Sequence, residues 1–195
     1  MEVIRADELD NPGPVLASMF VEGFGQHLQY FSKDPKRLAA AFEHMFLPDH
    51  FFVAVEDGVV IAMAGIASGN ELALKLDATQ LRRGLGLFKG TIAAIMLGRE
   101  WNRGYPIPVG DEWGSIQFVA SAAGQRRRGG ARAVLDHLIA QSGYTTFILE
   151  VGDLNTPAVA LYESLGFTET ARVPDPDAKY SGYNYRLYLR LDRAD

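Results

Sequence analysis

Residues 149–167 read L-E-V-G-D-L-N-T-P-A-V-A-L-Y-E-S-L-G-F, and this stretch joins the end of a strand to a short helix. The strand is T-T-F-I-L-E-V, rich in the β-branched and large apolar residues that favour an extended backbone. Pro157 stands near the start of the helix and Gly166 just after its end, which is the usual place of each residue. Thr156 is the better N-cap candidate and would leave the Asn155 side chain free, although Asn155 could itself be the cap.

A second informative stretch is Q-R-R-R-G-G-A-R-A-V-L, residues 125–135, between a predicted strand and a predicted helix. Amide N–H groups in the first turn of a helix have no partner within the helix, and the helix dipole adds positive charge there. Gly129 and Gly130 carry no side chain that would keep a phosphate from the backbone, and Ala131 is nearly as small. The stretch therefore predicts an anion site at a helix N-terminus.

The rest of the chain mixes helical and strand patterns, which predicts an α/β fold. Asp57-Gly58 between two apolar runs is a strong hairpin signal. Leu81, Leu85, Phe88, Ile92 and Ile95 form an apolar stripe that predicts one helix. Apolar and polar residues alternate over residues 183–191, as in a half-buried strand. The expected strands are 2–6, 51–55, 59–66, 115–121, 145–151, 167–173 and 183–191, and helices are expected near 16–24, 38–46, 81–95, 131–139 and 156–165.

Together the two stretches resemble the GCN5-related N-acetyltransferase (GNAT) family. R-R-R-G-G-A, residues 126–131, resembles the family's R/Q-x-x-G-x-G/A pyrophosphate loop. Residues 149–167 are similar to its L-x-V-x-x-x-N-x-x-A-x-x-L-Y-x-x-x-G-F motif, and the neighbouring elements follow in the same order. Ala123 stands where the family often has proline, and Ser121 where a strand valine is common. The resemblance implies the GNAT fold, a central mixed twisted sheet flanked by helices.

The resemblance also implies how acetyl-CoA, the co-substrate, would bind. Backbone N–H groups of the loop would hold its pyrophosphate. The backbone of a strand would pair with the pantetheine arm and steady a developing oxyanion, and the Asn155 side chain would contact the same arm. The loop residues are Arg126, Arg127, Arg128, Gly129, Gly130 and Ala131, and the strand residues are Val119, Ala120 and Ser121.

Two side chains are candidates for proton transfer. Tyr162 matches the family tyrosine and would protonate the departing thiolate, although its helical stripe would also suit a core residue. A lysine-like amine, with a pKa of about 10.4, must lose a proton before it attacks. The resemblance to N-terminal-acetylating members that share L-E-V implies that Glu150 is the general base. The alternatives are Asp111, Glu112 or a chain of waters, with Glu150 then an ordinary polar residue of the strand.

Composition limits the function classes. The 195 residues carry a net charge of -5 and include no cysteine, which excludes thiolate nucleophiles, cysteine-based zinc sites and disulfides. The four histidines show no ligand spacing, so no metal is expected. The negative net charge disfavours binding to nucleic acid, and no apolar run is long enough to span a membrane. We expect a single cytoplasmic GNAT domain over residues 1–195, with a helical insertion at about 70–111.

The expected function is transfer of the acetyl group of acetyl-CoA to a primary amine by direct attack in a ternary complex. The alternative is a non-catalytic module that binds coenzyme A on the same fold. The acceptor is expected to be a small-molecule amine or a peptide or protein amine. The first two helices and the loop 174–182 would select it. His27 lies in the helical region that shapes the acceptor cleft in the resembling family, where it would line the cleft or have a purely structural role. The stripe at 81–95 packs internally or makes a homodimer.

Overall fold

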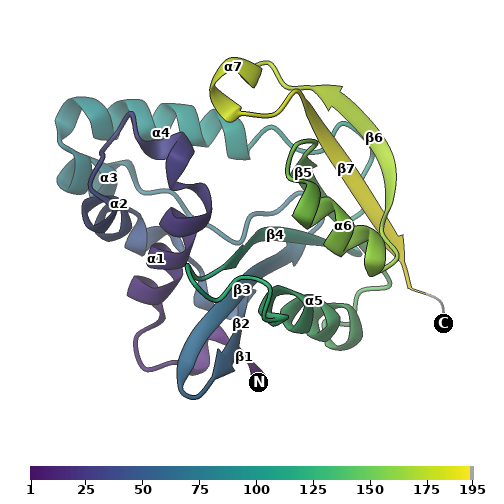
Figure 1. Ribbon diagram of the computed structural model, residues 1–195. Helices are drawn as coiled ribbons and strands as arrows, with labels where there is room; N and C mark the ends of the chain where they lie inside the picture. The colour runs from purple at the N-terminus through teal and green to yellow at the C-terminus, as the bar shows by residue number, and fades with distance from the viewer. Residues whose placement is uncertain (194–195) are drawn as a thin grey trace.

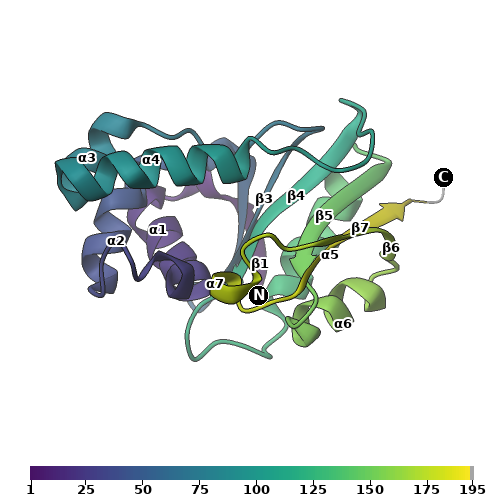
Figure 2. The ribbon, with the colours of Figure 1, turned by 90° about the horizontal axis from the view of Figure 1, so that it is seen from above.

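The computed structural model describes residues 1–193, which form a twisted sheet with helices on both faces (Figures 1 and 2). The strands are β1 (Glu2–Arg5), β2 (Phe51–Glu56), β3 (Val59–Ser68), β4 (Trp113–Ser121), β5 (Thr146–Gly152), β6 (Thr168–Pro174) and β7 (Tyr185–Asp192). Their order in the sheet is β1-β2-β3-β4-β5-β7-β6, and β4 and β5 are the parallel neighbours among otherwise antiparallel pairs. The predicted mixed α/β fold is confirmed.

The helices divide between the two faces of the sheet, as the view from above shows (Figure 2). One face carries the first four helices, and the other carries α5 and α6. A short seventh helix, α7, lies in the connection between β6 and β7. The bounds are α1 (Pro12–Phe24), α2 (Pro35–Phe42), α3 (Ala78–Leu85), α4 (Leu87–Trp101), α5 (Gly130–Gln141), α6 (Thr156–Ser164) and α7 (Ala178–Ser181).

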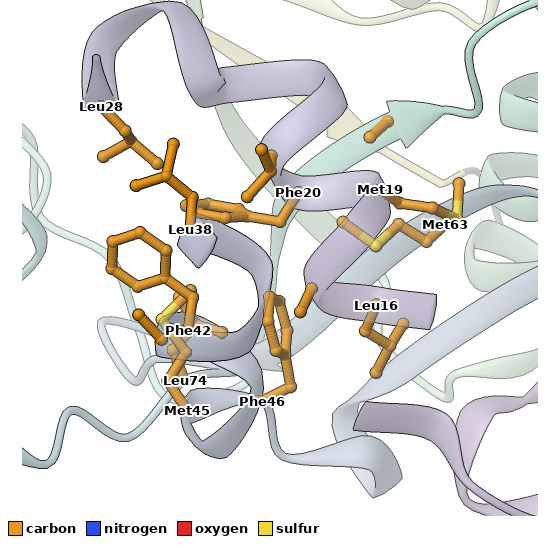
Figure 3. Close-up of a cluster of buried hydrophobic side chains, with 14 of the residues drawn as sticks. Leu16, Met19, Phe20, Leu28, Leu38, Phe42, Met45, Phe46, Met63 and Leu74 are labelled. Carbon is orange, nitrogen blue, oxygen red and sulfur yellow. The ribbon is translucent and has the colours of Figure 1, made fainter. Parts of the chain in front are cut away.

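Each face has its own hydrophobic cluster. On the α1–α4 face, Leu16, Met19 and Phe20 of α1 pack with Phe42 and with buried side chains of β2 and β3 (Figure 3). On the other face, α5 and α6 cover the apolar side chains of the central strands. Burial of a large apolar side chain contributes roughly 1.5–3 kcal/mol, so these clusters fix the positions of the helices against the sheet.

The local signals at the hairpin behave as predicted. Asp57 and Gly58 have φ angles of 51° and 75°, which is the left-handed pair that a tight two-residue turn requires. The turn joins β2 to β3 and fixes their register, with Glu56 opposite Val59.

The predicted single helix over 81–95 is wrong, because the chain forms two helices that meet at Gly86. Leu81 and Leu85 of α3 are buried, whereas Phe88 and Ile95 of α4 are largely exposed. The apolar stripe therefore does not cover one face, and part of α4 remains apolar and open to solvent. Within residues 1–193 no helix combines the length and the hydropathy needed to cross a membrane.

Candidate functional site

The parallel strands β4 and β5 separate part of the way along their length. Their pairing begins at Trp113 opposite Thr146 and ends at Ile116 opposite Leu149. Beyond this point Gln117, Ala120 and Ser121 remain paired with β3, and residues 150–152 remain paired with β7. The two strands therefore have facing edges that do not bond to each other, and an extended ligand could pair with either edge.

A bulge in β4 shapes this open edge. The register against β3 gains one residue on β4 between Gln117 and Ala120, and Phe118 has a φ of 53°. The Phe118 ring lies against the aromatic side chains of Phe20, Phe24, Phe51 and Trp101, which hold the bulge from the α1–α4 face.

Past the bulge, the strand alternation decides which backbone groups are open. The N–H of Ala122 donates to the carbonyl of Ile61 in β3. Strand alternation therefore turns the N–H group of Ser121 toward the open edge and that of Ala120 toward β3. Of the three predicted strand residues, Ser121 presents its N–H group to the gap, and Val119 lies in the bulge.

The loop after β4 leads directly into α5, as predicted. Arg127 and Gly129 have φ angles of 63° and 84°, so the loop turns sharply before the helix. Gly130 is the first residue of α5, and a Cβ there would lie 2.9 Å from the Ala62 side chain. The first helical hydrogen bond runs from Ala133 N–H to the Gly129 carbonyl. Among the described residues, the N–H groups of 126–132 have no protein acceptor, which is the backbone arrangement that the predicted anion site requires.

The arginine side chains of the loop have different partners. Arg128 forms a 2.5 Å ion pair with Glu56 at the β2–β3 turn and donates to Gln125. Arg132 donates to the hydroxyl of Ser164 in α6. Arg126 and Arg127 are exposed and form no ion pair within residues 1–193. Two of the three predicted loop arginines are thus available to a ligand through their side chains.

The loop is also braced from the other face of the sheet. The N–H of Ala123 donates to the Glu22 carboxylate of α1 at 2.5 Å. A proline at this position, which the family often has, would lack that N–H. Alanine in place of proline at position 123 therefore keeps an N–H group that bonds to Glu22.

The α6 N-terminus corrects one prediction. Helix α6 begins at Thr156, so Asn155 and not Thr156 occupies the N-cap position. The expected cap at Thr156 is wrong, but the Asn155 side chain makes no capping hydrogen bond and is exposed. It therefore remains free to contact a ligand beside β5.

Tyr162 lies on the inner side of α6 and is only 6 % exposed. Its ring packs against Phe167 in the cluster that also contains Ile116 and Leu149, the last paired residues of β4 and β5. Burial raises the pKa of the Tyr162 phenol above its usual value, so the hydroxyl keeps its proton at neutral pH. No other described residue hydrogen-bonds to this hydroxyl.

Glu150 is the first residue of β5 beyond the paired segment, and it points to the opposite face from Tyr162. Its neighbours Leu149 and Val151 belong to the α5–α6 cluster, so strand alternation turns Glu150 toward the α4 side. The Glu150 side chain is 31 % exposed. The two predicted catalytic side chains therefore flank the gap from opposite faces of the sheet.

A cluster of charged residues surrounds Glu150. Arg103 donates to the Glu150 carboxylate at 2.7 Å, and Arg186 lies 3.7 Å from its other oxygen. Arg103 also pairs with Glu100 at 3.1 Å. Tyr188, opposite Glu150 in the β5–β7 register, shares a side-chain hydrogen bond with it. Burial raises the pKa of Glu150, and the positive charge of Arg103 and the Tyr188 hydrogen bond oppose that rise.

Sequence reasoning missed most of this cluster. The alternation over residues 183–191 is typical of a half-buried strand, yet its polar members Arg186 and Tyr188 are 3 % and 2 % exposed. The segment after α4 covers that face, where Tyr105 bonds to Ser115 at 2.6 Å. The alternative bases, Asp111 and Glu112, are exposed and precede the paired start of β4, away from the gap.

The two regions predicted to select the acceptor are joined by a contact at their borders. The His27 ring, in the segment after α1, lies 6.3 Å from the Tyr183 ring in the connection before β7. A pocket of about 320 Å³ lies nearby on the β7 side, with Arg103, Tyr105, Arg186 and Tyr188 among its walls. Arg103 and Tyr188 contact Glu150 as well, so the pocket adjoins the charged cluster.

Comparisons with known proteins agree with this arrangement. The family model described as the acetyltransferase (GNAT) family matches residues 18–167. Comparison with curated proteins gave no significant match.

Similar solved structures share the fold at low sequence identity. An N-acetyltransferase from Staphylococcus aureus Mu50 has a TM-score of 0.64 and 15 % identity, with 98 % of this chain and 100 % of that chain covered. A ribosomal-protein-alanine N-acetyltransferase from Brucella melitensis has a TM-score of 0.63 and 15 % identity, with 98 % and 99 % covered. The ribosomal-protein-S18-alanine N-acetyltransferase from Escherichia coli has a TM-score of 0.54 and 19 % identity, with 100 % and 94 % covered. Because the family model matches most of the chain, residues 18–167, the chain belongs to the GNAT family of acetyltransferases and is an acyltransferase.

Proposed function

We propose that this protein transfers the acetyl group of acetyl-CoA to a primary amine by direct attack in a ternary complex. The observation that carries the proposal is that two features occur together: a loop with unbonded backbone N–H groups, residues 126–132, and the open edges of β4 and β5. One feature binds a pyrophosphate and the other an extended amide-bearing chain, and coenzyme A has both.

The residues that would hold acetyl-CoA follow from this fit. The N–H groups of the loop would bind the pyrophosphate, the edge at Val119 and Ser121 would pair with the pantetheine arm, and Asn155 would contact that arm. When bound, acetyl-CoA supplies a thioester carbonyl that an amine can attack. An N–H group at the β4 edge would then stabilise the negative charge that develops on the carbonyl oxygen.

Proton transfer is assigned to Glu150 and Tyr162. Glu150 would accept the proton that the acceptor amine must lose before its nitrogen bonds to the carbonyl carbon. As the carbon–sulfur bond breaks, Tyr162 would donate its proton to the thiolate. Burial raises the pKa of this phenol, so the proton is present at neutral pH. The products are the acetylated amine and the free thiol.

We infer that the acceptor is a cationic amine of a peptide or of a small molecule. Glu100, Glu150 and Asp175 outnumber Arg103 and Arg186 in the linked ion pairs beside the gap, which leaves an excess of negative charge. Two structural neighbours act on the alanine of a ribosomal protein, so a peptide with an N-terminal alanine is the first acceptor to test.

The remaining predictions concern organisation. We propose that residues 1–195 form one acetyltransferase domain, which is supported by the continuous sheet from β1 to β6. The exposed apolar side chains of α4 could serve a homodimer, which the sequence left open beside internal packing. The cytoplasmic location stays a prediction.

The test is release of free thiol from acetyl-CoA in the presence of separate amines: an N-terminal-alanine peptide, a lysine peptide, a polyamine and an aromatic amine. We expect release with at least one of them, and Tyr162→Phe should lower the maximal rate by about 10²-fold while coenzyme A binding is kept. Coenzyme A binding without thiol release from any amine would favour the non-catalytic module.

A further inference from the structure

We propose that Arg103, in the segment between α4 and β4, positions Glu150 and holds its carboxylate in the ionised form that accepts the amine's proton. This inference rests on the proposed function, and it gives the segment 70–111 a role in the reaction. Arg103 need not touch the substrate, so we describe it as a positioning residue.

The geometry provides the first argument. Arg103 bonds to the Glu150 carboxylate at 2.7 Å and lies 3.4 Å from the Tyr188 hydroxyl. Its other terminal nitrogen is held by both oxygens of Glu100, at 3.1 and 3.3 Å. An arginine bound at both ends of its guanidinium has a fixed orientation, and so does the carboxylate that it contacts.

The electrostatics provide the second argument. Burial favours the neutral form of Glu150, which could not accept a proton, and it raises the pKa of this carboxyl. Arg103 is the largest opposing influence, and the nearby Glu100 raises the pKa further. From β7, Arg186 and Tyr188 face the same carboxylate, and the phenols of Tyr105 and Tyr183 also lie close enough to interact with it. Without Arg103, one of the two cations beside Glu150 would be lost.

The pH dependence of kcat/KM tests the assignment, with the best amine from the panel. Arg103→Gln should move the acid limb of the profile to higher pH, because Glu150 would then stay protonated over a wider range. At neutral pH we expect kcat/KM of Arg103→Gln to fall about tenfold or more. On the alkaline plateau, where Glu150 is ionised in both proteins, the decrease should stay below about threefold. Arg103→Lys keeps the positive charge, so the acid limb of its profile should lie close to that of the parent protein.

Two further variants separate charge from structure. Arg5→Gln is the matched control, because Arg5 forms an exposed ion pair with Asp7 at the same 2.7 Å distance in the region of β1. It should leave the profile unchanged. Glu100→Gln removes a negative charge near Glu150 and should move the acid limb in the opposite direction, to lower pH.

Several outcomes would overturn the inference. A uniform loss of activity at all pH values in Arg103→Gln, with no displaced limb, would leave Arg103 a structural role only. An acid limb that persists in Glu150→Gln would show that another group is the base, while the proposed function would stand. If no amine is acetylated, the proposed function fails. In that case the pH titration of the Glu150 carboxyl carbon, followed by NMR, tests the role of Arg103 alone. The Glu150 signal is the one that is missing in Glu150→Gln. A titration curve that is unchanged in Arg103→Gln contradicts the inference.

Discussion

Among single residues, the arginines of the loop before α5 show how similar side chains can have different partners. Arg128 is tied to Glu56 and Gln125, whereas Arg126 and Arg127 have no ion-pair partner among the described residues. The backbone carries the predicted contact with the pyrophosphate. We propose that the free guanidiniums of Arg126 and Arg127 add a contact to the 3′-phosphate of coenzyme A.

This difference predicts the effect of two matched variants on coenzyme A binding. Arg127→Gln should weaken binding of coenzyme A about tenfold, since a hydrogen bond to a charged group contributes roughly 1.5–3 kcal/mol. It should barely affect dephospho-coenzyme A, which lacks the 3′-phosphate. Arg128→Gln should change both affinities little. Calorimetric titration of both ligands measures the ratio, and an equal loss for the two ligands would contradict the assignment.

Among the elements, α5 depends on its close approach to β3. A Cβ at Gly130 would lie 2.9 Å from Ala62 and 3.1 Å from Ile61, so the helix N-terminus could not keep its place over the sheet. That place determines where the free N–H groups point. The glycine is therefore needed for packing, and its neighbour Gly129, with a φ of 84°, is needed for the turn.

Alanine at Gly130 should therefore destabilise the protein by about 1–3 kcal/mol and weaken coenzyme A binding. Gly98→Ala is the matched control, because Gly98 lies inside α4 and a Cβ there would meet no atom within 4 Å. That variant should stabilise the protein by roughly 0.5–1 kcal/mol. Urea denaturation compares the two, and a Gly130→Ala protein as stable as the parent would refute the packing argument.

At the scale of the whole molecule, a buried ion-pair network links parts of the chain that are far apart in sequence. Arg186 of β7 pairs with Asp175 at 2.6 Å and with Glu100 of α4 at 2.5 Å. The side chains of Arg186 and Asp175 are 4 % and 0 % exposed. The network therefore joins the helical face, the β6–β7 connection and the sheet beside the candidate site.

Loss of the buried arginine should be costly. Arg186→Ala leaves Asp175 buried without its partner, and we expect a loss of about 3–5 kcal/mol in the free energy of unfolding. Arg172→Ala removes an exposed pair with Glu169 and should cost at most about 1 kcal/mol. Equal losses in urea denaturation would show that the Arg186 network does not stabilise the fold.

The sequence predicted those features whose signals are local. The turn at Asp57, the loop before α5 and the short helix α6 each depend on neighbouring residues, and each was found where expected. Contacts between distant residues were missed, as with Arg103 and Glu150, which are separated by 47 positions. Alternation in β7 indicated two faces but not that α4 and its following segment would bury the polar one.

The central claim is tested most directly by incubating the protein with acetyl-CoA and the best amine, then measuring acetylated amine, free coenzyme A and the intact protein mass. The account predicts equal amounts of acetylated amine and free coenzyme A, with the protein itself unmodified. Coenzyme A bound without acetylated amine, or an acetyl group retained on the protein as an intermediate, would contradict direct transfer.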